Sequence, residues 1–587
     1  MIATEKNNFL PEKILFLVLS LVYLCFSFYY AHLRLYGDAA YYLFRVVNEE
    51  NFYIVHNRPA SVLIEWIPVL LAKSGCNLEL IIYSFSIGES LIWIGCAGLI
   101  LLKWKDFNLA NCLLLIPFIG IRYNYFNPVS ELILAIPISF VLLKLLGRQD
   151  NSRSVWIIIG VMILFLFLSH ALFAVILLFL GLIYLLDGKL SRSSLFKLIL
   201  ISAGSVLIYY FSMDEYDRLM IYKGMEGVEQ ESDFQLKQYY GPFMFQLQIH
   251  IGLMVMVAWL LISLIYNRQW RFTLFFMFFT CGYLAYIILT KHSYFPDTME
   301  PFERYSLPFT VMVLIMFYSF VKFNGRWGTF LLLAIVCYQS IQLSKIALDL
   351  ECRHQQLVNV LDVAKERGLS KVVVDSKNFN PFKMGHDWLF GTESLLISSA
   401  RYQHTSIQML VRESVDNAIL DNGNDSQFIE YPWWMLNSKI LNKRYFNLDL
   451  QKFTYLNSIS HVNGGGRASS NVGLSGSVEP LLNSSAAGRK WIGFLLLQNT
   501  GKDTIYSAYS DDCNYIFSKW YADKSAQEVM KSDTMYILAD LLPSMKSRQL
   551  IKFNLPKQKG DYSVKYYLKE RESAIEYFIA EQNIRIN

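Results

Sequence analysis

The sequence predicts a polytopic α-helical membrane protein with a large soluble domain at its C-terminal end. Of the 587 residues, 54% are hydrophobic and 17% are charged, whereas soluble domains are about one quarter charged. Apolar runs dominate residues 14–347, and residues 348–587 have an ordinary soluble composition. Lys and Arg fall in alternate loops between the apolar runs, as in a chain that crosses a membrane repeatedly.

Apolar segments of about 20 residues are long enough to cross a bilayer as helices. Eleven segments are expected to do so: residues 14–33, 79–102, 107–121, 127–146, 155–169, 171–187, 195–212, 246–266, 272–290, 305–321 and 328–347. The first is too long for the apolar core of a signal peptide, and no small-residue cleavage site follows it. We therefore interpret it as an anchor.

Lys and Arg also predict the orientation, because cytoplasmic loops retain these residues. The short basic loops would lie inside, and the long loops 34–78, 213–245 and 291–304 outside. This prediction places the N-terminus in the cytoplasm of a bacterial cell, with the protein in the inner membrane. The C-terminal domain and an active face would lie on the outer side. In the first outer loop, residues 39–50 and 58–73 are predicted to form helices in the outer interface.

The soluble part has two regions of different pattern. The expected domains are a membrane domain at 1–347, a mixed α/β region at 348–489 and a β-sandwich-like domain at 490–587. A helical pattern covers 353–367, a strand-like run covers 371–375, and a Gly/Ser-rich stretch at 463–488 is typical of a linker. Six short alternating runs from residue 491 onward predict a small antiparallel sandwich, which we interpret as structural rather than sugar-binding.

Net charge and cysteine spacing exclude two classes of function. The formal net charge of +5 is small for this length and gives no argument for a nucleic-acid partner. The eight cysteines include no CxxC pair and no metal-ligand spacing, so they predict neither a disulfide framework nor a metal site.

Asp38 is the first candidate for chemistry. It follows the first span in the run Leu35-Tyr36-Gly37-Asp38, where a carboxylate could deprotonate a hydroxyl or hold a divalent cation. The alternative is a structural N-cap for a helix that starts at Ala39, since Asp is a favoured capping residue. The residues themselves leave both interpretations open.

A second polar group joins two spans at residues 122–131. Glu131 is expected about one turn into the fourth span, where an unpaired carboxylate is unfavourable. Arg122 is a candidate partner, so a structural ion pair between the two is the alternative to a substrate-binding role. His170 ends another span and could be a ligand, although hydrogen-bonded packing is the favoured interpretation for a lone histidine in a membrane.

A third group precedes a late span and is rich in cations. It contains Lys291, His292, Glu303, Arg304 and Tyr305. The cations would face the boundary of the outer leaflet, where a lipid phosphate lies, and the guanidinium fork of arginine binds phosphate through two hydrogen bonds.

Taken in order along the chain, these groups resemble the GT-C superfamily of membrane glycosyltransferases. Asp38 follows the first span, as in that family, and interfacial helices follow it. The turn ending in Glu131 is similar to the R-x-x-S-N-x-x-E-type turn, although the stretch from Arg122 to Glu131 is longer and contains Pro128.

The late motif is also similar. Glu303-Arg304-Tyr305, followed by Pro308, resembles the E-R-[FY]-x-x-P run that opens a late span in several members. The resemblance covers residues 10–350. The sequence departs from members that carry a paired D-E or D-x-D in the first loop, because the acids next after Asp38 are Glu49 and Glu50.

The resemblance implies transfer of a sugar from a polyprenyl-phosphate-linked donor to an acceptor hydroxyl at the outer face. Asp38 would act as general base, and Arg304 with Lys291 or His292 would neutralise the leaving phosphate, with Arg58 as a second candidate. A substrate-binding or structural role is expected for Arg122, Glu131, Glu303, Tyr305 and His170. The acceptor would be a glycan, a lipid or a protein, and membrane lipid is a further partner. The resemblance establishes no cofactor, and a divalent cation, Mg²⁺ or Mn²⁺, could bind at such a site.

Two other functions compete with this expectation. A flippase or transporter of lipid-linked sugars would need polar residues along a path through the bilayer, and mid-span ionisable residues are sparse apart from Glu89. A non-catalytic membrane assembly protein would need only an anchor, and eleven spans exceed that need.

Overall fold

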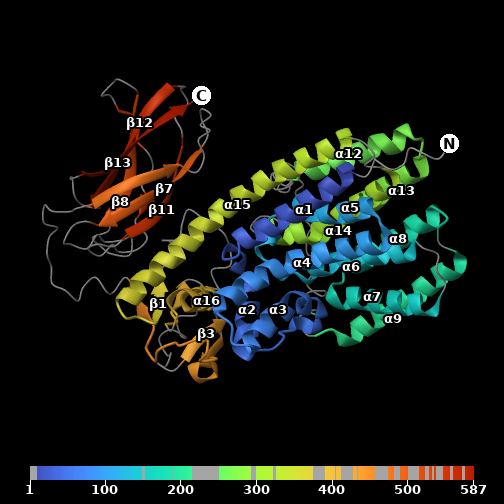
Figure 1. Cartoon of the computed structure of the whole chain (residues 1–587), viewed down its shortest axis with the longest axis horizontal. Helices are drawn as coiled ribbons and strands as arrows, with labels where there is room; N and C mark the ends of the chain where they lie inside the picture. Colours follow the sequence, from blue (N-terminus) through green and yellow to red (C-terminus); the bar gives the residue numbers. More distant parts are fainter. Residues whose placement is uncertain are drawn as a thin grey trace. The chain divides into compact units, whose positions relative to one another are not determined.

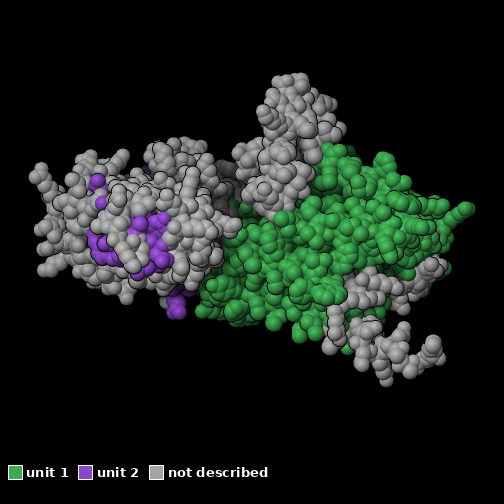
Figure 2. Space-filling model, turned by 90° about the horizontal axis from the view of Figure 1, so that it is seen from above, with its two compact units in different colours: residues 1–347 green, residues 348–587 purple. Residues whose placement is uncertain are grey.

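The structure of the chain is a computed structural model. It describes residues 10–147, 152–189, 191–214, 218, 250–291, 299–321, 326–374, 390–403, 405–411, 427–431, 434–456, 474–480, 490–499, 514–522, 528–531, 535–536, 546–554, 560–570 and 576–586. Two compact units divide the chain, Met1–Ala347 and Leu348–Asn587 (Figure 2). Each unit is considered by itself below.

The first unit is a helical bundle (Figure 1). Its helices are α1 (Leu10–Tyr29), α2 (Asp38–Glu49), α3 (Val62–Lys73), α4 (Leu78–Trp104), α5 (Phe107–Ile119), α6 (Glu131–Leu146), α7 (Arg153–Ser169), α8 (Phe173–Leu186), α9 (Arg192–Ser212), α12 (Ile251–Tyr266), α13 (Trp270–Lys291), α14 (Met299–Phe320) and α15 (Arg326–Glu366). Four short 3₁₀ helices connect them: η1 (Leu33–Leu35), η2 (Val55–Asn57), η3 (Pro59–Ser61) and η4 (Asn124–Phe126).

Each of the eleven apolar segments expected from the sequence contains a helix of this bundle. Among the described residues, five helices, α1, α4, α9, α13 and α15, are long and apolar enough to cross a membrane. Shorter apolar helices are α5, α7, α8 and α12. Membrane-helix character is therefore present, and the number of eleven crossings stays a prediction.

Burial separates the centre of the bundle from its surface. Nearly every residue of α5 and α6 is buried, and α5 packs against α1, α4 and α14. The helix α9, by contrast, exposes a row of large apolar side chains: Phe196, Ile199, Leu200, Val206, Leu207, Ile208, Tyr210 and Phe211. Such a surface is unfavourable in water and is expected where lipid covers a helix.

The first long loop contains α2 and α3, the two helices that the sequence predicted at 39–50 and 58–73. The helix α3 packs against α4, and α2 packs against α3 (Figure 1). Their position in a membrane interface stays a prediction.

One helix differs from the expectation at the end of the first unit. A span ending at residue 347 and a separate helix at 353–367 were expected, but α15 continues for 41 residues through both segments. No glycine or proline lies between them, so nothing in the local sequence interrupts the backbone hydrogen bonds.

The second unit begins with a small parallel sheet in the order β2-β1-β5, formed by β1 (Lys371–Val374), β2 (Gln408–Val411) and β5 (Thr454–Tyr455). The helix α16 (Phe390–Tyr402) joins β1 to β2 and packs on β2. Ser394 Oγ accepts the Met409 N–H at 2.8 Å and Ser398 Oγ accepts the Ile407 N–H at 2.8 Å, which holds this buried helix on the sheet edge. A hairpin of β3 (Gln427–Tyr431) and β4 (Trp434–Asn437) follows.

Two antiparallel sheets form the rest of this unit. One has the order β11-β7-β6, and the other has the order β10-β8-β12-β13 with β9 paired to β8. Their strands are β6 (Leu474–Pro480), β7 (Lys490–Asn499), β8 (Asn514–Ala522), β9 (Glu528–Lys531), β10 (Met535–Tyr536), β11 (Lys546–Asn554), β12 (Gly560–Glu570) and β13 (Glu576–Ile586). All six predicted runs contain a strand.

The linker predicted at 463–488 is wrong for its central part. Residues Leu474–Pro480 form β6, which pairs with β7 from Leu474 opposite Asn499 to Pro480 opposite Gly493. The apolar neighbour β7 supplies a hydrogen-bonding partner that the Gly/Ser-rich composition does not reveal. The remainder of the stretch lies outside the described residues.

Candidate functional site

The polar residues singled out in the sequence gather where three central helices have one end in common. The turn 120–130 follows α5 and precedes α6, and α14 contributes its first turns. The first long loop, with α2, η2 and η3, reaches the same place through contacts of η3 with α6.

Glu303 holds the turn together. Its carboxylate accepts the backbone N–H groups of Arg122 at 2.6 Å, Tyr123 at 2.9 Å and Asn124 at 3.3 Å. The side chain is only 2% exposed, so these bonds replace the water that a carboxylate would otherwise need. This geometry gives Glu303 a structural role as the anchor of α14 on the turn.

Arg122 does not pair with Glu131, and that part of the expectation is wrong. The guanidinium of Arg122 donates to Gln339 Oε1 on α15, and its Nε has no partner. Burial lowers the pKa of Arg122 to about 10, against the opposing effect of the Glu303 charge. Its side chain extends toward α15, away from the start of α6, because the turn itself is held by Glu303.

Glu131 pairs instead with Arg58 from the first loop. Arg58 Nη1 lies 3.4 Å from Glu131 Oε2, and the Tyr42 hydroxyl donates to Glu131 Oε1 at 3.4 Å. Glu131 is the first residue of α6 and is not one turn inside it, so the helix dipole favours its charge. The sequence analysis did not identify Arg58 as the partner of Glu131, because the two residues are 73 positions apart in the chain.

Asp38 is the first residue of α2, and Gly37 is the residue that precedes the helix as N-cap. The expectation of a helix starting at Ala39 with Asp38 as its cap is therefore wrong by one position, because Gly37 adopts a φ of 64° that favours glycine. Burial first, and then the charges of Glu131 and Asp38, raise the pKa of the Tyr42 phenol, while Arg58 opposes them. Asp38, Arg58 and Glu131 thus all lie within electrostatic range of the Tyr42 phenol.

Arg304 lies beside this group. Its Nη2 is 3.5 Å from Asn124 Oδ1, and its buried Nε has no hydrogen-bond partner. Among the described residues no carboxylate forms an ion pair with Arg304. The Tyr305 phenol lies within electrostatic range of both Arg304 and Arg58.

One candidate, His170, is not brought into this arrangement, and two others lie outside the described part of the structure. His170 follows α7, and its Nδ1 accepts the Leu172 N–H at 3.2 Å, a local contact that ends the helix. Lys291 is the last residue of α13, and its side chain lies outside the described part of the structure, as does His292.

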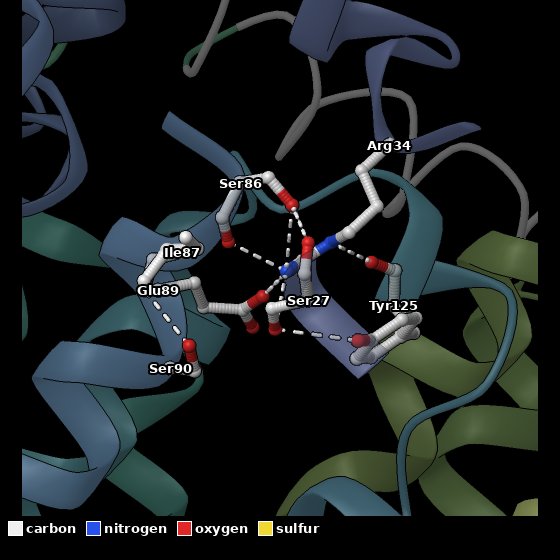
Figure 3. Close-up of polar contacts among 7 residues, drawn as sticks. All are labelled: Ser27, Arg34, Ser86, Ile87, Glu89, Ser90 and Tyr125. Atoms are coloured by element: carbon white, nitrogen blue, oxygen red, sulfur yellow. Dashed lines mark hydrogen bonds and ion pairs between the residues drawn. The ribbon is translucent and has the colours of Figure 1, made fainter. Parts of the chain in front are cut away.

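The sequence analysis missed Arg34, which lies fully buried at the centre of a hydrogen-bond network (Figure 3). Its guanidinium donates to Tyr125 O at 2.9 Å, to Ser27 Oγ at 2.8 Å and to Ser86 O at 2.6 Å. It also forms an ion pair with Glu89 of α4. The network ties α1, α4 and η4 together next to the site. An arginine just past a span, four residues before Asp38, was the signal for it.

Glu65 was also missed, although it is a carboxyl group in a mostly apolar helix. It is fully buried on α3, and its Oε2 accepts the Tyr53 N–H at 2.8 Å while Oε1 has no partner. Burial, opposed by the Tyr53 N–H, raises the pKa of Glu65 to about 8. Glu65 therefore holds a proton at neutral pH, and the nearby carboxylate of Glu131 contributes to the rise in its pKa.

The described residues contain no group of three or more His, Cys, Asp or Glu side chains that could hold a metal ion.

Comparison with known proteins adds little to this geometry. No protein-family model matches the chain, and no curated protein matches it. Among solved structures, the CARDB domain of a Pyrococcus furiosus protein, solved in complex with di-metal ions, is 11% identical with a TM-score of 0.15. That match covers 21% of this chain and 95% of the domain. The sporulation control protein Spo0M of Bacillus subtilis is 12% identical with a TM-score of 0.14, over 19% of this chain and 49% of Spo0M. Similarities this low assign neither a fold nor an activity.

Proposed function

We propose that the protein is an integral membrane glycosyltransferase of the GT-C type. It would transfer a sugar from a polyprenyl-phosphate-linked donor to an acceptor hydroxyl at the outer face of a bacterial inner membrane. One observation carries the proposal: a carboxylate at the start of α2, an arginine of the first long loop and an arginine of α14 lie within electrostatic range of Tyr42 or Tyr305 at one end of the bundle. Asp38, Arg58 and Arg304 are the residues concerned.

Asp38 is the best placed of the four carboxyl groups to act as the base. Glu65, Glu131 and Glu303 are 0%, 5% and 2% exposed, whereas Asp38 is partly exposed and can meet an acceptor from water. In the proposed step Asp38 takes the proton of the acceptor hydroxyl. That oxygen then forms a bond to the anomeric carbon, and the bond from this carbon to the phosphate oxygen breaks.

The two arginines are suited to the phosphate that leaves with the polyprenyl chain. Negative charge develops on its oxygens as the sugar departs, and guanidinium groups fixed beforehand stabilise it without reorganisation. The Nε of Arg304 is buried with no partner, which is a costly state for a donor unless a ligand satisfies it. Arg58 already carries one carboxylate partner, Glu131, which holds it in place.

Orientation in the membrane is the first part of the proposal to test. An outer-face reaction requires that the C-terminal domain be extracytoplasmic, as the distribution of Lys and Arg predicts. Alkaline phosphatase fused after Asn587 should be active. An inactive phosphatase, together with an active cytoplasmic reporter at the same junction, would remove the outer-face mechanism.

The activity itself is tested with protein purified into lipid nanodiscs. The nanodiscs are incubated with a panel of polyprenyl-phosphate sugars together with candidate acceptors that carry a hydroxyl, and mass spectrometry measures the free polyprenyl phosphate and the glycosylated acceptor. Release is expected with at least one donor and should survive Glu49→Gln, which changes only an exposed ion pair with Arg45 in the same helix as Asp38. If no donor yields polyprenyl phosphate and glycosylated acceptor above the level seen in nanodiscs without the protein, the proposed function is wrong.

Transport of lipid-linked sugars has no separate support. Glu89 was the mid-span carboxylate that such a path would have used, and it pairs with the buried Arg34. A charge held by its own counter-ion gives no argument for a polar route through the bilayer.

A further inference from the structure

Two neighbouring residues in the first loop have a backbone conformation that costs free energy. His56 and Asn57 have φ angles of 53° and 57°, in the left-handed region that side chains other than glycine rarely adopt. Such a conformation is less costly for Asn than for most side chains, and two adjacent non-glycine residues in it persist where surrounding contacts hold them. The contacts that hold this pair therefore indicate what the conformation is for.

Both residues are held by the end of α9. His56 Nδ1 lies 2.5 Å from Asp214 Oδ2, and Asn57 Nδ2 donates to Ser212 O at 3.0 Å. Ser212 is the last residue of α9, and Asp214 lies two residues beyond it. Two successive side chains of one loop thus bind the carboxylate of Asp214 and the backbone oxygen of Ser212. Both acceptors lie at the end of a helix more than 150 residues away in the chain.

Arg58 follows this pair directly. Its backbone N–H donates to Val55 O at 3.0 Å, which closes the strained turn. Pro59 comes next and restricts Arg58 to the extended conformation that it shows, with φ −97° and ψ 105°. The position of Arg58 is therefore set by the strained turn on one side and the proline ring on the other.

We propose that Asp214, acting through His56, is a positioning residue that holds Arg58 in place for the donor phosphate. The contact between Asp214 and His56 stabilises the left-handed turn, and the turn directs the Arg58 side chain toward Glu131 and the Tyr305 phenol. Asn57 and the end of α9 act in the same way. The part of the inference that concerns the phosphate rests on the proposed function, and the part that concerns Arg58 does not.

The position of Arg58 can be measured without any donor. Thermal unfolding of Arg58→Ala, Glu131→Gln and the double variant gives the coupling between these two side chains. The same cycle in the Asp214→Ala background should show that the coupling is lost. If the coupling is unchanged there, Asp214 does not position Arg58, whatever the protein does with sugars.

Donor binding then tests the functional part. Asp214→Ala should weaken binding of a polyprenyl-phosphate sugar by about 10- to 100-fold, since misplacement of a binding group by ~1 Å can cost ~100-fold. Asp214→Asn, which keeps an oxygen for His56, should restore much of the affinity. In an Arg58→Ala background, Asp214→Ala should add no further loss. An equal loss with and without Arg58 would overturn the inference in favour of a general structural role.

Backbone strain offers a second route that does not remove Asp214. Asn57→Gly tolerates the left-handed conformation and should retain the Arg58–Glu131 coupling, whereas Asn57→Val should abolish it. Asp187→Ala is the matched control, because Asp187 is an ion-paired, partly exposed aspartate at the end of another helix. It should change neither coupling nor affinity. Loss of coupling in Asn57→Gly equal to that in Asn57→Val would contradict the role of the strained turn.

Discussion

The charged groups at the two ends of the central helices α5, α6 and α14 differ in how they are paired. At one end α5, α6 and α14 meet around Asp106. This carboxylate accepts the Leu109 N–H at 3.0 Å, the Lys144 ammonium at 2.6 Å and the Tyr318 hydroxyl at 2.8 Å. About 20 Å away, at the other end of the 13-residue α5, the same helices meet at the candidate site.

The difference lies in how many atoms of the ionisable side chains have a hydrogen-bond or ion-pair partner. The Asp106 cluster pairs one anion with one cation, and none of its side-chain atoms is buried without a partner. At the candidate site, the Nε atoms of Arg122 and Arg304 and one oxygen of Glu65 are buried and unpartnered. Buried ionisable groups without a partner lower stability, whereas the buried unpartnered atoms near Asp106 include those of the neutral side chains of Trp104, Asn108 and Asn111. We expect changes at the Asp106 end to affect stability and changes at the other end to affect activity.

Asp38→Asn should have the largest effect. Asn cannot accept the proton of the acceptor hydroxyl, and loss of a general base costs about 10²- to 10⁴-fold in rate. The melting temperature and the donor affinity should stay at wild-type values, because Asn at a helix start is well tolerated. Single-turnover assays with the purified variant measure this rate. Near-normal transfer would mean that Asp38 is a structural residue and would redirect the search to Glu131.

Asp106→Ala should give the largest loss of stability. It leaves Lys144 and Tyr318 without their acceptor and removes the N-terminal cap of α5. Breaking a buried pair costs about 3–5 kcal/mol, and the partial exposure of Lys144 and Asp106, 23% and 14%, reduces the expected cost to roughly 2 kcal/mol. Thermal unfolding in nanodiscs measures it. A rate loss with unchanged stability would reverse the comparison between the two ends.

Arg304→Ala should weaken donor binding by about 10- to 100-fold, the equivalent of one or two charge-assisted hydrogen bonds. Arg304→Lys should restore only part of the affinity, because the planar fork is lost. Stability should change little, since the only described hydrogen bond of this side chain is the 3.5 Å contact with Asn124. Equal affinity in wild type, Ala and Lys variants would show that Arg304 does not contact the phosphate.

Substitution of Glu65 is expected to have the smallest effect, a change in how stability depends on pH. Its pKa is raised from 4.5 to about 8 by burial, so the folded state binds the proton more tightly than the unfolded state. The stability due to Glu65 is therefore fully present below pH 4.5 and declines as pH rises toward 8. Glu65→Gln imitates the protonated form and should remove this part of the decline. Parallel stability curves for both proteins across this range would show that Glu65 is ionised throughout.

Sequence alone was sufficient for features that depend on neighbouring residues. Apolar segments became helices because a helix satisfies its backbone hydrogen bonds within the segment, which a low-dielectric environment requires. Alternating runs after residue 490 became strands because successive side chains of a strand point to opposite faces of a sheet, so an alternating pattern places the apolar ones on one face. Asp38, Arg58, Glu131 and Arg304 could be selected because charged groups next to apolar spans are costly and therefore informative.

The partners of those residues were decided by the tertiary structure. Glu131 pairs with Arg58 and not with the nearer Arg122, and Glu303 binds backbone groups about 180 residues before it. Arg34 and Glu89, the pair that ties α1 to α4, lie 55 positions apart. A hydrogen bond depends on which segments approach within about 3 Å, and packing of distant helices sets that approach. Local sequence therefore indicated several of the groups that take part in the site, and the fold decided which of them meet.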